Sequence, residues 1–244
     1  MNDASTPAAS GRSVAAERGL AWWTEAWALF VRAAGMWVVL GILLFLILLV
    51  VGVVPLLGAL VSTLLVPPFV AGWMLAVRKV KGGGALELAD LFTAFRSDKL
   101  GPLIVQGALL LAAVVVIALV AMVFGLGAVF GVATGGAHQS ASAVLAAMGA
   151  GVLALALMLA LGALITMALW FAPALVVFRG TAPLDALRAS FSASLKNIVP
   201  FVVYGVIYIV ASVVASIPFG LGWLVLAPLA MISVYCAYED VFGA

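Results

Sequence analysis

Long uncharged stretches of apolar residues alternate along the chain with short polar segments. Six such stretches occur, and none of them contains Asp, Glu, Lys, Arg or His. An α-helix rises about 1.5 Å per residue, so about 20 residues cross the ~30 Å hydrocarbon core of a bilayer. The pattern therefore predicts an all-α membrane protein with six transmembrane helices, over residues 35–54, 59–77, 102–130, 143–178, 200–217 and 221–238.

Three shorter segments place apolar residues at helical spacing and charged residues on other faces, and each precedes an odd-numbered stretch. Such helices lie in the membrane interface, a depth that tryptophan also favours. In the third segment, Thr181, Pro183 and Asp185 supply a capping hydroxyl, a first-turn proline and an early carboxylate. We predict interfacial amphipathic helices with the apolar faces Leu20, Trp23, Trp27 and Phe30; Leu88, Leu91, Phe92 and Phe95; and Leu184, Leu187, Phe191 and Leu195.

The same order of parts recurs three times: an interfacial helix, an outbound crossing, a turn and an inbound crossing. Each inbound crossing contains a proline, at Pro68, Pro173 and Pro228. Equivalent features at equivalent places indicate an internal repeat. We predict three hairpin repeats, at about residues 20–80, 85–178 and 182–240.

The positions of the charged residues predict how the chain is oriented in the membrane. Only 8% of the residues are charged and 67% are hydrophobic, whereas a soluble domain carries roughly 25% charged residues. All eleven Lys and Arg fall on one side of the predicted threading, and an excess of these residues marks the cytoplasmic face. We expect one transmembrane domain over residues 18–240, a disordered cytoplasmic tail over residues 1–17, and both termini in the cytoplasm.

Two sets of polar residues are candidates for binding. A rim of cations at the cytoplasmic face is a candidate contact for anionic lipid headgroups, although the topology rule alone would also place positive charge there. Polar residues inside the crossings either bond between helices or line a path for a ligand. The rim consists of Arg78, Lys79, Lys81, Arg179 and Lys196, and the intramembrane set of Gln106, Thr166, Tyr204 and Tyr208.

Several kinds of chemistry are disfavoured by what the crossings lack. Intramembrane ionisable groups are typical of proton relays and ion-coupled carriers, and these crossings have none. His138 has no second His, Cys or carboxylate near it in the sequence, so it does not form a metal motif. The single cysteine, Cys236, is interpreted as an ordinary apolar residue. We expect no enzymatic activity, no cofactor, no metal and no nucleic-acid partner.

The middle repeat has longer crossings than the other two. Residues 102–130 would form a helix of about 43 Å, against a hydrocarbon core of ~30 Å. One interpretation is that the helices tilt in the bilayer. The other is that the hairpin projects past the outer interface and packs against another membrane protein subunit along residues 102–178.

The segment APALVVFRGTAPLDALRASFSASLKNIVPFVVYGVI resembles a recurrent piece of a large group of six-helix bacterial membrane proteins. That group includes the membrane domain found with some glycerophosphoryl diester phosphodiesterases. The soluble phosphodiesterase domain and its metal-binding acids have no counterpart in this sequence, so the resemblance implies no catalytic residues. It implies a multi-pass protein of the bacterial inner membrane.

Two functions remain open at this point. We favour a structural or accessory protein that interacts with membrane lipids or is associated with a larger membrane complex. The alternative is a transporter or channel for an uncharged or lipid-like substrate, gated at the three prolines of the inbound crossings.

Overall fold

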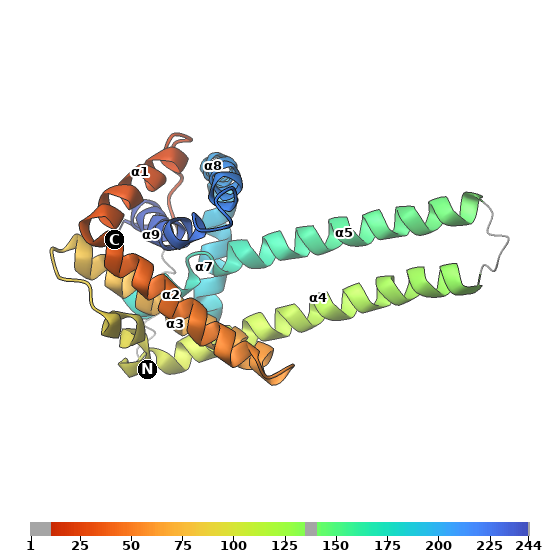
Figure 1. Ribbon diagram of the computed structural model, residues 1–244, viewed down its shortest axis with the longest axis horizontal. Coiled ribbons are helices and arrows are strands. Elements are labelled where there is room, and N and C mark those ends of the chain that lie inside the picture. The colour runs from red at the N-terminus through yellow and green to blue at the C-terminus, as the bar shows by residue number, and fades with distance from the viewer. Residues whose placement is uncertain (1–10, 135–140, 244) are drawn as a thin grey trace, which may run out of the picture. The chain divides into compact units, whose positions relative to one another are not determined.

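A computed structural model describes residues 11–134 and 141–243 (Figure 1), and this part of the chain contains helices and no strands. Two short elements, η1 and η2, are 3₁₀ helices and the others are α-helices. In chain order the elements are α1 (Arg18–Phe30), η1 (Val31–Ala33), α2 (Ala34–Gly52), α3 (Leu57–Lys81), η2 (Leu88–Arg96), α4 (Leu100–Thr134), α5 (Ala141–Leu169), α6 (Ala172–Arg179), α7 (Pro183–Lys196), α8 (Ile198–Ser216) and α9 (Trp223–Phe242).

The prediction of six membrane-spanning helices is confirmed at the level of length and composition. Among the described residues, six helical stretches are long and apolar enough to cross a membrane. The first joins α1, η1 and α2, with a break in helical geometry at Ala33. The fourth is broken at residues 170–171, just before α6, which has Pro173 in its first turn. Proline is tolerated in a first helical turn because the amide it lacks has no partner there.

The described chain forms two compact units. One comprises residues 11–108 and 167–243, and the other comprises residues 109–166. In the second unit, none of the side chains that the structure describes is buried. Helix α4 has 35 residues, which corresponds to about 52 Å of helix. Tilt of the hairpin in the bilayer and its projection past the outer interface both stay predictions.

The first unit has an aromatic core that draws on both ends of the chain. Helix α1 packs on α8 and α9, and α2 packs on α3. Trp22, Trp37 and Trp73 are fully buried, and the rings of Trp37 and Trp73 lie 5.5 Å apart. At Gly19, an added Cβ would lie 2.3 Å from the carbonyl oxygen of Pro200. Only glycine permits α1 and α8 to approach this closely.

The face of α1 that packs on the protein differs from the predicted stripe. Trp23 and Phe30 of the predicted stripe are buried, but Leu20 and Trp27 are about half exposed. Trp22, which lies outside the stripe, is fully buried. Because α1 carries large apolar residues on two faces, helical periodicity alone does not tell which face contacts protein. The outward face is left for another apolar environment.

In helix α7 the buried face also differs from the predicted apolar stripe, and the difference is larger. Its buried residues are small, including Ala186, Ser190 and Ala193, whereas Leu184 and Leu195 are about half exposed. Small residues let α7 approach its neighbours closely. The helix begins after Ala182 and has no side-chain cap, so the predicted capping role of Thr181 is wrong. Pro183 and Asp185 do lie in the first turn.

Segment η2 is a 3₁₀ helix that lies along α3. Leu91 is fully buried, Phe92 and Phe95 contact the ring of Phe69, and Leu88 is about half exposed. The Asp90 carboxylate accepts hydrogen bonds from the Glu87 backbone amide at 2.8 Å and from the Lys79 ammonium at 2.9 Å. These contacts fix the start of the segment against the end of α3.

Residues 11–17 contact the rest of the chain, whereas residues 1–10 of the predicted disordered tail lie outside the described residues. The backbone amide of Arg12 donates to the carbonyl oxygen of Val241 at 2.9 Å, and the amide of Val14 donates to Asn197 Oδ1 at 2.8 Å. Gly11 is buried, with the position of an added Cβ only 2.6 Å from the Ala193 Cβ. The sequence gives no sign of these contacts because their partners lie about 180 residues or more away.

Candidate functional site

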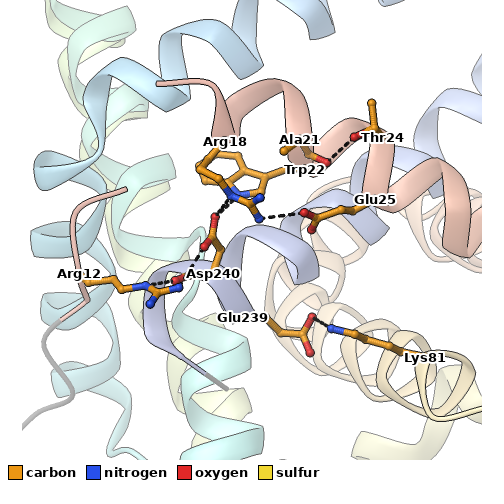
Figure 2. Close-up of polar contacts among 9 residues, drawn as sticks. All are labelled: Arg12, Arg18, Ala21, Trp22, Thr24, Glu25, Lys81, Glu239 and Asp240. Atoms are coloured by element: carbon orange, nitrogen blue, oxygen red, sulfur yellow. Dashed lines mark hydrogen bonds and ion pairs between the residues drawn. The ribbon is translucent and has the colours of Figure 1, made fainter. Parts of the chain in front are cut away.

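Six charged residues of the first unit form ion pairs where α1, α3 and α9 meet, and Figure 2 shows them: Arg12, Arg18, Glu25, Lys81, Glu239 and Asp240. The Asp240 carboxylate accepts hydrogen bonds from Arg12 Nη2 at 3.1 Å, from Trp22 Nε1 at 3.0 Å and from Arg18 Nε. Its side chain is only 11% exposed. Arg18 also pairs with Glu25 at 2.8 Å. One carboxylate in the last turn of α9 therefore joins the N-terminal segment and α1 to the end of the chain.

Next to this cluster lies a pocket of about 590 Å³. The ends of three helices, α3, α6 and α9, supply its walls. Three cations and one carboxylate line it, together with aromatic rings, so positive charge is in excess. The lining residues are Arg78, Lys81, Gly82, Phe178, Arg179, Tyr235, Tyr238, Glu239 and Gly243.

Aromatic rings hold the two guanidinium groups of the pocket. The Arg78 guanidinium lies 4.5 Å from the centre of the Phe178 ring, and that of Arg179 lies 5.7 Å from the centre of the Phe242 ring. Arg179 Nη2 also donates to the carbonyl oxygen of Phe242. Cations at this distance from a ring face are attracted by its quadrupole. Lys81 is engaged differently, with its ammonium 2.5 Å from Glu239 Oε2.

The structure brings together three of the five cations that the sequence marks as candidate headgroup contacts. Arg78, Lys81 and Arg179 line the one pocket. Lys79 instead pairs with Asp90 and lines a smaller neighbouring pocket of about 330 Å³ that it shares with Arg78. Lys196 lies apart from both pockets and donates to the carbonyl oxygen of Gly11 at 3.3 Å.

Sequence reasoning missed the aromatic part of this pocket. Phe178, Tyr235 and Tyr238 belong to apolar stretches that the pattern assigns to the membrane, and nothing in the pattern places α6 beside α9. The available signal is local: an aromatic residue directly precedes a charged residue in Phe178-Arg179 and in Tyr238-Glu239. Both pairs lie at the ends of predicted crossings, where aromatic residues favour the interface.

The four intramembrane polar candidates do not share one cavity. Tyr204 and Tyr208 line an apolar pocket of about 450 Å³, together with Trp170, Phe201, Gly205, Ala230, Met231 and Val234. The Tyr204 hydroxyl bonds to Ser233 Oγ at 2.9 Å, which links α8 to α9. Thr166 lies in the second unit and donates to the Gly162 carbonyl oxygen at 2.9 Å.

Gln106 is fully buried near the start of α4, and neither of its side-chain polar atoms has a partner among the described residues. Of the two roles that the sequence allows for Gln106, a hydrogen bond to another helix is not seen among the described residues. A buried amide without hydrogen bonds is costly.

Few other residues of the described part offer reactive chemistry. In residues 11–134 and 141–243, no group of three His, Cys, Asp or Glu side chains comes together as metal ligands. Cys236 is buried in α9. The neighbouring Lys99 ammonium, 2.6 Å away, lowers the pKa of the Asp98 carboxyl below its usual value. His138 lies outside the described residues.

Comparison with known proteins gives one informative relative. The chain is 30% identical over 224 residues to a protein of Burkholderia thailandensis named probable inner membrane protein, and the match covers 88% of this chain and 80% of that protein. No family model matches the chain. No solved structure matches it either. A relation to the membrane domain of glycerophosphoryl diester phosphodiesterases thus stays a prediction.

Proposed function

The chain belongs to the family of the Burkholderia thailandensis probable inner membrane protein, and from this premise we propose a structural or accessory role in the bacterial inner membrane. In this role the protein interacts with membrane lipids or is associated with a larger membrane complex. It acts without catalysis, as a multi-pass protein with its charged end and both termini in the cytoplasm.

The observation that carries this proposal is the unequal distribution of charge and apolar surface. The basic pocket and the ion pairs around Asp240 gather at the ends of α3, α6 and α9. Elsewhere the exposed surface is rich in large apolar side chains, on α2, α4, α5 and α8 above all. A protein with this surface has lipid as its main neighbour along the helices and headgroups at its charged end.

The outward apolar faces of α1 and α7 fit the same proposal. Leu20, Trp27, Leu184 and Leu195 are all about half exposed. A helix that buries one face on protein and offers a second apolar face is suited to the membrane interface. We propose that α1, η2 and α7 are the interfacial elements of three hairpin repeats.

A test is to purify the whole chain from membranes in a mild detergent and to measure retained phospholipid and copurifying membrane subunits. We expect anionic phospholipid above its share of the membrane, or a stoichiometric partner subunit. The region that we propose for such a partner is residues 102–178. A solitary protein that retains neither would contradict the proposed role.

The apolar pocket beside Tyr204 favours a second candidate function, transport of an uncharged or lipid-like substrate. Its aromatic lining and its place between α8 and α9 suit an acyl chain. An added Cβ at Gly205 would meet nothing within 4 Å, so Gly205→Leu fills the pocket without a backbone clash. If the protein moves lipid across proteoliposome membranes, this substitution should slow the movement of a fluorescent lipid analogue, whereas Gly35→Leu, also at an open glycine, should not.

A further inference from the structure

We propose that the pocket between the ends of α3, α6 and α9 is a binding site for a phosphate-bearing anionic group, with Arg78 and Arg179 as its ligands. This inference rests on the proposed lipid-interacting function and deepens it by naming a site and a ligand chemistry. The two arginines come from different elements, 101 positions apart in the sequence, and line the same pocket.

The pocket has the size and the charge that such a group requires. Its volume of about 590 Å³ lies within the range of roughly 300–1,000 Å³ found for small-molecule sites. Glu239 is the only carboxylate among its lining residues, and it is already paired with Lys81. The two guanidinium groups therefore face an entering anion without a competing free carboxylate.

Arg78 has the fewest polar contacts of the three cations in the pocket, since Arg179 donates to Phe242 and Lys81 pairs with Glu239. Among the residues that the structure describes, it forms no ion pair with a carboxylate. Its guanidinium lies over the Phe178 ring, which restricts its orientation. A planar guanidinium offers several N–H donors in a fixed fork and binds phosphate oxygens in pairs.

The simplest other explanation is that cations gather here because helix C-termini are partly negative. Two of the three ends are already capped by glycine in the left-handed conformation, Gly180 after α6 and Gly243 after α9. The Gly180 amide donates to the Val176 carbonyl oxygen at 3.0 Å, and the Gly243 amide donates to that of Glu239 at 2.8 Å. These carbonyl groups do not depend on Arg78 for a partner.

The walls of the pocket favour a lipid as the source of the phosphate. Phe178, Tyr235 and Tyr238 line it beside the cations, and aromatic side chains of this kind lie at headgroup depth in membranes. An anionic phospholipid would place its phosphate between the two guanidinium groups. A soluble phosphate compound offers the same chemistry without the need for a membrane.

The experiment measures binding of dioleoyl phosphatidylglycerol to the purified whole chain in detergent, by native mass spectrometry and titration. We compare Arg78→Gln/Arg179→Gln with the control Arg96→Gln/Arg188→Gln, which removes the same charge from two exposed arginines outside the pocket. A charge-assisted hydrogen bond lost at each arginine corresponds to roughly tenfold weaker binding. We expect a loss of about tenfold or more in the pocket variant and less than twofold in the control.

A second variant keeps the site testable if the first one fails to fold. Arg78→Lys/Arg179→Lys retains both charges and removes the paired donors. We expect it to bind phosphatidylglycerol severalfold more weakly than the unchanged chain. Circular dichroism and a single elution peak check that each variant is folded. Equal binding by the unchanged chain and a folded pocket variant would overturn the site.

Further measurements identify the source of the phosphate. They also distinguish failure of this site from failure of the proposed lipid-interacting role. Competition by inorganic phosphate or glycerol 1-phosphate at concentrations equal to that of the lipid would support the site with a soluble ligand. Binding of the lipid alone would support it with a headgroup. If the pocket variant loses no more lipid than the control, this site fails and the lipid-interacting role stands. If the unchanged chain binds neither lipid nor phosphate, the site fails, and the absence of any retained lipid or partner counts against the role as well.

Discussion

At the scale of single residues, Asp240 differs from an ordinary exposed charge. Isolated surface ion pairs contribute little to stability. Asp240 is different because it is mostly buried and accepts hydrogen bonds from two arginines and an indole. The residue acts as the connection between the two ends of the chain.

Replacement of Asp240 by Ala should destabilise the protein by about 1–3 kcal/mol, because charge-assisted hydrogen bonds are lost and the indole N–H of Trp22 is left without a partner. Thermal unfolding in detergent measures the change. The matched control is Asp185→Ala, which removes an exposed carboxylate 3.5 Å from Arg188 and should alter stability by about 0.5 kcal/mol or less. Equal effects of both substitutions would contradict the role of Asp240.

Gly19 gives a second test at this scale. An added methyl group would lie 2.3 Å from the Pro200 carbonyl oxygen, which belongs to backbone and cannot easily move. We expect Gly19→Ala to cost about 1–3 kcal/mol of stability, since overpacking forces α1 away from α8. Gly35→Ala is the control, because nothing lies within 4 Å of its added Cβ. Unfolding midpoints that fall together for both variants would argue against the close approach.

At the scale of elements, the sequence predicts where the helices lie better than what each face contacts. The apolar stretches match α2, α3, α4, α8 and α9 to within a few residues at each end, because the polar or turn-forming residues that bound each stretch can be read from the sequence. The faces of α1 and α7 could not be assigned in this way. With lipid outside and protein inside, both faces are apolar, and small residues such as Ala186 and Ser190 mark the buried one.

For the candidate site too, the sequence predicts the residues but not their contacts. The cations Arg78, Lys81 and Arg179 stand out because charge is rare in this sequence. Their convergence on one pocket, and the role of Phe178 beside them, depend on the packing of α3 against α6 and α9. Which helices pack against each other cannot be read from a single sequence.

Charge placed along α5 tests how much of this helix lies in hydrocarbon. Leu145 and Leu155 are both well exposed on α5, and Leu145 lies about 36 Å from the end of the helix at Leu169. We expect Leu155→Lys to reduce the yield of membrane-inserted protein, since lysine at mid-membrane costs about 2.5–3.5 kcal/mol on insertion scales. Leu145→Lys should be tolerated if the hairpin projects past the bilayer. Equal losses would instead place both positions in hydrocarbon.

At the scale of the whole molecule, the threading of the chain is open to a direct test. We expect single cysteines at Ala85 and Ala182 to react with a membrane-impermeant thiol reagent from the cytoplasmic side, and one at His138 from the opposite side. The background carries Cys236→Ser so that only the added thiol is read. Labelling of positions 85 and 182 from opposite sides would overturn the six-crossing arrangement.

The contact between residues 11–30 and α9 has a consequence for biosynthesis. Arg12, Arg18 and Trp22 leave the ribosome more than 200 residues before their shared partner, Asp240. Helix α1 must therefore wait at the membrane, with its tryptophan side uncovered, until α9 has been made. A nascent chain that lacks the last turn of α9 would keep that surface bare and open to proteolysis.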